Sequence, residues 1–174
     1  MIIGIDPGCS GALALLFPDG ELLDVLLMPT IKVGTKTRVN GAAISAWIAD
    51  IKDRLDRGCG PDKIHAYLEQ VNAMPSGPPG GKRNMGTASA FTFGHAAGLV
   101  EGVVTGAGIP LTLITPQAWK KSAGLIGQDK DAARSRAVQL YPSCRLLDLK
   151  GKGQAIADAI LIARHGAGLS GSIS

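Results

Sequence analysis

Cysteine is scarce in this chain of 174 residues, and its three cysteines stand far apart, at positions 9, 59 and 144. An odd number without any Cys-x-x-Cys spacing indicates neither a disulfide framework nor a structural zinc site. The thiols are therefore expected to be reduced, as they are in a cytoplasm.

Long apolar runs are also absent. The apolar stretch 91–110 is interrupted by His95, Glu101 and several glycines, which makes it a poor membrane span. No basic segment followed by an apolar one opens the chain, so no signal peptide is expected. The composition, 45% apolar and 18% charged, is that of a globular protein, and we expect one domain over residues 1–174. A net charge of +4 favours a polyanionic partner.

The remaining patterns predict alternating strands and helices. Strands are expected at residues 2–6, 12–17, 21–28, 64–71 and 109–114, with turns such as Pro-Asp-Gly between the first three. Helices are expected at residues 42–55, 85–107, 116–121, 129–141 and 153–165. Residues 31–40 are polar and basic and are interpreted as a loop or ragged strand, and the Pro/Gly-rich residues 72–84 as a loop. This order predicts an α/β fold with a mixed five-stranded sheet flanked by helices.

Three acids stand inside otherwise apolar segments: Asp6, Glu69 and Asp158. An ionised carboxylate in an apolar core costs several kcal/mol unless something pairs with it. One such acid could pair with Arg or Lys, or face solvent. Three of them are better explained by convergence around divalent cations, and carboxylate oxygens suit Mg²⁺ or Mn²⁺. Two such ions about 4 Å apart can activate a water for phosphodiester displacement.

These segments resemble those of a known family. The opening GIDPG, a Glu that ends a middle strand, and the final ADAILIA helix resemble the ribonuclease H-like superfamily. The fit is best to the RuvC family of Holliday junction resolvases, including its phage branch, over residues 2–163. The resemblance implies a metal-dependent DNA endonuclease that resolves Holliday junctions by paired symmetric nicks during recombination and repair. It also implies a homodimer in the cytoplasm of a bacterium or a phage-infected cell.

The resemblance further assigns residue roles. Asp6, Glu69 and Asp158 would bind two Mg²⁺ ions, with Mn²⁺ possible. Lys120 and Lys130 fall on two lysine positions of the family, and Lys120 would stabilise charge on the scissile phosphate. The expected DNA-binding residues are Lys82, Arg83, Lys120, Lys121, Lys130 and Arg134. A solvated surface is the alternative for any single lysine.

A helix and a tryptophan each allow a structural interpretation and a functional one. The helix 85–107, rich in Gly and Ala, is our choice for the dimer contact, and simple packing on the sheet is its alternative. Trp119 is interpreted as a core residue, with stacking on a DNA base as its alternative.

One position departs from the family pattern. The resolvases usually carry a further acid or a histidine one turn before the last Asp, whereas Ala155 and Gln154 stand here. Gln154 could hold a water bound to the metal. The departure leaves open a branched-DNA binding protein with weak or lost catalysis as one alternative. A second alternative is a nuclease that acts broadly on forks, flaps or RNA–DNA hybrids, because the resemblance to the phage branch of the family implies broad branch specificity. The opening also resembles the phosphate loop of actin-like ATPases, but those need two such domains, for which this chain is too short.

Overall fold

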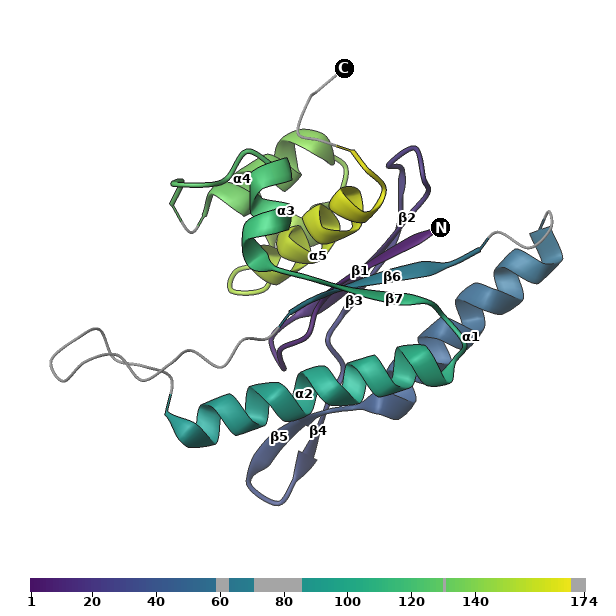
Figure 1. The fold of residues 1–174 in the computed structure, drawn as a ribbon, viewed down its shortest axis with the longest axis vertical. Helices are drawn as coiled ribbons and strands as arrows, with labels where there is room; N and C mark the ends of the chain where they lie inside the picture. The colour runs from purple at the N-terminus through teal and green to yellow at the C-terminus, as the bar shows by residue number, and fades with distance from the viewer. Residues whose placement is uncertain (59–62, 71–85, 130, 170–174) are drawn as a thin grey trace, which may run out of the picture.

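The main sheet of the protein has five strands in the spatial order β3-β2-β1-β6-β7, as the computed structural model shows (Figure 1). The structure describes residues 1–58, 63–70, 86–129 and 131–169. The strands are β1 (Ile2–Asp6), β2 (Ala12–Leu16), β3 (Leu22–Leu27), β6 (His65–Glu69) and β7 (Leu111–Ile114). The first three pair in antiparallel fashion, whereas β6 runs parallel to both β1 and β7. The predicted mixed five-stranded sheet is confirmed.

Helices cover both faces of this sheet (Figure 1). One face carries α3 (Pro116–Ser122), α4 (Ala132–Leu140) and α5 (Gly153–Gly166), and a short 3-10 helix, η1 (Arg145–Asp148), precedes α5. The other face carries α1 (Gly41–Gly58) and α2 (Thr87–Gly106). Because the central strands are buried on both sides, β2 is apolar throughout rather than alternating.

The alternation of side chains along the strands divides the core in two. Ile3 and Ile5 of β1 pack in the cluster that includes Ile44 and Ile48 of α1. Ile2, which points to the opposite face, packs in the cluster built around α5. Helix α5 therefore lies directly over β1 and β2, with which it makes its most extensive contacts.

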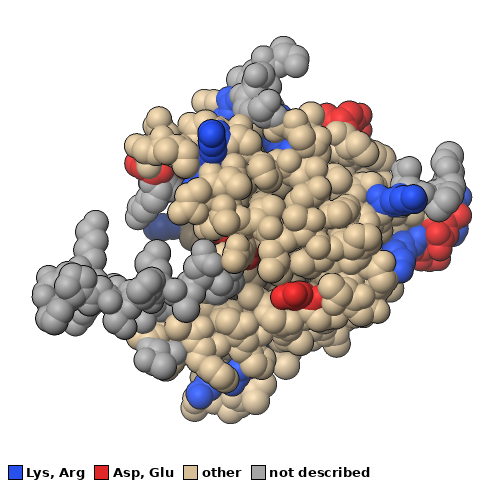
Figure 2. All heavy atoms as spheres, in the orientation of Figure 1, with Lys and Arg blue, Asp and Glu red and all other residues tan. Residues whose placement is uncertain are grey.

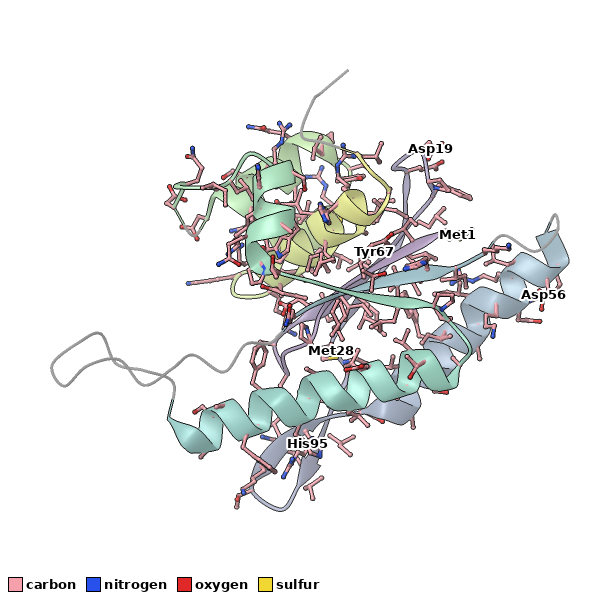
Figure 3. All side chains as sticks on the ribbon, in the orientation of Figure 1. Met1, Asp19, Met28, Asp56, Tyr67 and His95 are labelled. Atoms are coloured by element: carbon pink, nitrogen blue, oxygen red, sulfur yellow. The ribbon has the colours of Figure 1, made fainter. Side chains whose placement is uncertain are left out.

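Small residues allow α5 to approach the sheet closely. A Cβ atom on Gly4 of β1 would overlap the carbonyl oxygen of Ala159 and the backbone of Ala163. At the other end of the helix, a Cβ on Gly166 would overlap the ring of Tyr67, which lies on β6 (Figure 3). Only glycine leaves room at these two contacts, so the distance between helix and sheet is set by the glycines.

One predicted segment has a different structure from the one expected. Residues 31–40, interpreted as a loop or ragged strand, form the antiparallel hairpin of β4 (Thr30–Val33) and β5 (Lys36–Val39). The hairpin lies against α2, outside the main sheet (Figure 1). Most of its residues are exposed, so the apolar alternation typical of a half-buried strand is absent from its sequence.

The helix before η1 begins later in the chain than expected. The helix expected at 129–141 begins at Ala132, because the Asp129 carboxylate first accepts the backbone N–H of Asp131 in a local turn. The loop predicted at 72–84 lies outside the described residues. Within the described part of the chain, none of the helices has the length and apolar character that a membrane span needs.

Candidate active site

Two of the three predicted acids are brought together by the parallel pairing of β1 and β6. Ile5 lies opposite Leu68 in this pairing, so the next residues, Asp6 and Glu69, end neighbouring strands at the same edge of the sheet. The carboxyl ends of parallel strands are the usual place of a functional site in α/β proteins.

The third acid reaches the same edge from the helix above. Asp158 precedes Ala159, the residue whose backbone lies against Gly4 of β1. The negative charges of Asp6 and Glu69 both act on Asp158 and raise its pKa. The structure thus assembles Asp6, Glu69 and Asp158, which are far apart in the chain, into one acidic site.

The three carboxyl groups hold protons more tightly than exposed acids do. Burial raises the pKa of Asp6 to about 6, against the opposing effect of a hydrogen bond from the Gly8 backbone. Burial, and then the charges of the other two acids, raise the pKa of Asp158 to about 7. The pKa of Glu69 is raised by burial and by Asp6. The residues that the structure describes therefore do not compensate the negative charge of this site.

The donor set fits a hard divalent cation, because carboxylate oxygens are the ligands that Mg²⁺ and Mn²⁺ prefer. Among the described residues, no three His, Cys, Asp or Glu side chains stand close enough together to hold a metal ion as they are. Carboxylates that repel one another are expected to stay apart until a cation lies between them. Two features therefore support binding of a divalent cation here: the uncompensated negative charge of the three acids and the carboxylate oxygens that they offer as ligands.

Among the described residues, Lys120 is the cation whose positive charge acts on the acids. It lowers the pKa of both Glu69 and Asp158, although less than burial raises them. Its ammonium group lies 5.2 Å from the centre of the Trp119 ring. The start of α3 sets this arrangement: Thr115 caps the helix by accepting the Ala118 N–H at 3.2 Å.

Trp119 occupies the core, as predicted, with 1% of its surface exposed. Its indole group also lies close enough to Glu69 to lower the pKa of that carboxyl. This contact with Glu69 was not predicted from the sequence. The only signal for it in the sequence was that Trp119 precedes Lys120, a predicted site residue.

Gln154 contacts the site through Asp158. Its amide nitrogen donates to Asp158 Oδ1 at 2.9 Å, across one turn of α5. This contact helps to lower the pKa of Asp158. The spacing of four residues along a helix was the signal that places the two side chains on one face.

Comparison with solved structures identifies the fold. A structure described as "T. thermophilus RuvC in complex with Holliday junction substrate" is similar over 95% of this chain and 91% of its own, with a TM-score of 0.54 and 20% identity. A second structure, of Thermus thermophilus RuvC, covers 95% and 92% with a TM-score of 0.47 and 19% identity. The first of these structures shows that the chain has a RuvC-like fold.

The predicted α/β fold with a mixed five-stranded sheet flanked by helices is therefore confirmed, and it is similar to the fold of this RuvC structure. No family profile matches the chain, and no curated protein matches it either. At 20% identity the likeness concerns the fold, so the resemblance to the phage branch stays a prediction.

The other cations predicted to contact DNA are differently placed on this RuvC-like fold. Lys121 is exposed and borders a surface cavity of about 490 Å³ that the three acids do not line. Arg134 donates from Nε to the carbonyl oxygen of Leu147 at 2.7 Å, which ties α4 to η1. Lys82, Arg83 and Lys130 lie outside the described residues.

Figure 2 shows the described Lys and Arg side chains scattered over one face of the molecule, several of them on the part formed by α3, α4 and α5. They form no single dense basic patch in this view. Any contact with DNA on this face would therefore be spread over several separate cations.

Helix α2 of the RuvC-like fold has two different faces. Val100 and Val104 are fully buried in the core, so the packing alternative accounts for one side of the helix. Four glycines spaced four residues apart form a row along the helix. Apart from the helix's own neighbouring backbone, no atom of the described residues lies within 4 Å of the places where their Cβ atoms would be. These glycines are Gly94, Gly98, Gly102 and Gly106. Their row leaves a narrow, open strip of backbone that packing within one subunit does not explain.

Proposed function

We propose that this protein is a metal-dependent, structure-selective DNA endonuclease that resolves Holliday junctions by paired symmetric nicks. The observation that supports this most is the meeting of Asp6, Glu69 and Asp158 at the carboxyl edge of a RuvC-type sheet, with raised pKa values. The similar RuvC structure is described in complex with a Holliday junction substrate, which suggests branched DNA as the substrate here.

The three acids would hold two Mg²⁺ or Mn²⁺ ions. Such ions, when bound, activate water for attack on phosphorus and stabilise the leaving oxygen. Glu69 would lie beside the Trp119 indole, and Asp158 would be held by the hydrogen bond from the Gln154 amide. These contacts would limit the freedom of both carboxylates before the substrate arrives.

Lys120 would contact the phosphate group to be cut. It is exposed, and its charge acts on both Glu69 and Asp158, so a phosphate near the acids lies within its reach. An ammonium group in this place would stabilise negative charge that develops on the phosphate oxygens. The cut would leave a 5′-phosphate and a 3′-hydroxyl.

A homodimer would supply the two cuts. A four-way junction offers two equivalent strands, and a two-fold symmetric dimer presents two identical sites to them. The glycine row of α2 would be the contact, because small residues let two helix backbones approach closely. The cations Lys82, Arg83, Lys121 and Lys130 would contact the DNA arms, while Arg134 would contribute with the part of its guanidinium that Leu147 leaves free.

The test is cleavage of a synthetic four-way junction beside a linear duplex and a fork, each with Mg²⁺, Mn²⁺ or chelator, and with Asp6→Asn as a control. Paired symmetric nicks in the junction alone would support the proposal. Equal cutting of fork and junction would indicate a broader branch nuclease. Junction binding without metal-dependent cutting would indicate a binding protein, and the absence of a fourth acid near Ala155 would then explain the lost activity.

A further inference from the structure

Two buried side-chain atoms lack a hydrogen-bond partner in the described part of the protein: the Trp119 indole nitrogen and the Gln154 amide oxygen. Buried polar atoms in proteins are nearly always paired, so each exception calls for an explanation. Both belong to side chains that contact the site acids, Trp119 beside Glu69 and Gln154 on Asp158. The Trp119 nitrogen is a donor that acts on the Glu69 carboxylate, whereas the Gln154 oxygen is an acceptor to which no described residue donates. The Gln154 oxygen is therefore the atom that calls for a partner from outside the described residues.

The orientation of the Gln154 amide follows from its partner. Asp158 is acceptor-only when ionised, so the amide must turn its N–H group towards the carboxylate, as it does at 2.9 Å. Turning the amide over would place two oxygens against each other. The oxygen of the amide is attached to the same carbon as this N–H group, and is therefore held beside Asp158 without a donor of its own.

We propose that the Gln154 carbonyl oxygen is the fourth protein oxygen of the metal site, bound to a divalent cation or to one of its waters. The inference rests on the proposed function, in which Asp6, Glu69 and Asp158 hold the ions. Amide carbonyls are accepted ligands of hard cations. The cation would give this oxygen the partner that the described residues do not provide.

The substitution of an amide for a carboxylate has a consequence for affinity. A site with three acids and one neutral oxygen carries one negative charge fewer than a site with four acids. Metal affinity in oxygen-ligand sites rises with the number of charged ligands. The amide thus completes the coordination while leaving the site weaker for metal than an all-carboxylate version of itself.

The experiment is calorimetric titration of Mn²⁺ into the full-length, metal-free protein at pH 8, without DNA. Three variants accompany the wild type: Gln154→Met, which keeps the length of the side chain without its polar atoms, Gln154→Glu, and Gln70→Glu. The last adds the same charge next to Glu69 without providing an oxygen at position 154. Thermal unfolding in the presence of chelator checks that each variant folds. Gln154→Glu is expected to fold, because it places an acid in the first turn of α5, where the helix dipole favours negative charge.

The proposal predicts that Gln154→Met weakens Mn²⁺ binding by about 10- to 100-fold, the usual range for a lost supporting group. Gln154→Glu should tighten binding by about tenfold because it adds a charged ligand. Gln70→Glu should change the affinity by less than about threefold, since a non-ligating charge in contact with water is screened.

The outcomes separate this inference from the proposed function. If the wild type binds Mn²⁺ and Gln154→Met binds equally well, the ligand role is wrong while the metal site stands. Weaker binding by Gln154→Glu would show that the amide acts only through its N–H group on Asp158, which also overturns the inference. No binding of Mn²⁺ by the wild type would overturn both the inference and the metal dependence on which it rests.

Discussion

Gly4 of β1 and Ala159 of α5 touch through their backbones, so closely that a Cβ atom at position 4 would overlap the Ala159 carbonyl oxygen. The contact fixes the height of α5 above the sheet at the residue next to Asp158. The distance of Asp158 from the strand that ends in Asp6 therefore depends on the absence of a side chain at position 4.

Substitution of this glycine should damage both stability and activity. Gly4→Ala places a methyl group against backbone that cannot move aside, and we expect a loss of about 1–3 kcal/mol in the free energy of unfolding. Urea denaturation would measure the loss. The nearby Ile2→Val removes one methyl group without any overlap, and should cost only about 0.5–1.5 kcal/mol. Equal effects of the two substitutions would show that α5 does not depend on this contact.

Removal of the Asp6 carboxylate should separate stability from activity. Asp6→Asn should abolish cleavage while junction binding stays intact or becomes stronger, because a metal ligand and a negative charge are lost together. The metal-free variant should also be more stable than the wild type by on the order of 1–3 kcal/mol at pH 8, where burial of the ionised Asp6 is unfavourable. Gel-shift, cleavage and denaturation assays would test the three parts, and normal cutting by Asp6→Asn would refute the metal assignment.

The stability of the metal-free protein should fall as the pH rises from about 4 to about 7. Asp6 and Asp158 have pKa values raised from 3.8 to about 6 and about 7, so in this window the folded state binds more protons than the unfolded state. Unfolding is then favoured by increasing pH. A cation reverses the trend, because it binds the ionised carboxylates.

The corresponding measurement is the rise in melting temperature caused by Mn²⁺ at several pH values. We expect a clear rise at pH 8 and a much smaller one at pH 5.5, where protons compete for Asp158. A rise that is equal at both pH values would mean that Mn²⁺ binds elsewhere.

The indole N–H of Trp119 should contribute to cleavage through Glu69, in addition to the packing of the Trp119 ring in the core. Trp119→Phe keeps an aromatic ring but removes the group that lowers the pKa of Glu69. We expect cleavage to fall by about tenfold or more, as for other supporting contacts of a metal site. Trp47→Phe is a matched control, since Trp47 donates to Asp24 at 3.0 Å, away from the three acids. It should leave cleavage unchanged, and equal losses in the two variants would argue for a general packing effect.

A larger side chain in the glycine row of α2 should prevent dimer formation without unfolding the subunit. Gly98→Leu adds a side chain on a helix face where no other described segment lies within 4 Å of the Cβ position, so the fold of one subunit should tolerate it. Sedimentation velocity should show a dimer for the wild type and a monomer for this variant. Ser45→Leu, at an exposed position of α1, makes a similar surface change elsewhere. A wild-type monomer, or a Gly98→Leu dimer, would contradict the proposed contact.

Several features followed from local sequence alone. The strand at Ile2–Asp6 and the start of α3 at Thr115-Pro116 were predicted at the positions where they occur. Both depend on short-range chemistry: a β-branched apolar run before a Pro-Gly turn, and an N-cap before proline at N1. The acids also stood out by themselves, because Asp6, Glu69 and Asp158 interrupt apolar segments.

Other features depended on which segments pack together. The hairpin at Thr30–Val39 lacks a pattern of its own, because α2 rather than the sheet supports it. The engagement of Arg134 by Leu147 joins residues whose relation is set only when α4 meets η1. No spacing in the sequence distinguishes this arginine from one that is free to contact DNA.

The sequence by itself therefore determined the strands of the main sheet, most helices, the sheet class and the identity of the three acids, since these follow from residue type and short-range periodicity. Only the tertiary structure decided that Trp119 lies beside Glu69, and that the Gln154 amide is turned with its oxygen unpaired. Contacts of this kind depend on the meeting of α3 and α5 over two parallel strands. Local propensity does not specify that meeting, which results from the burial of apolar faces across the whole chain.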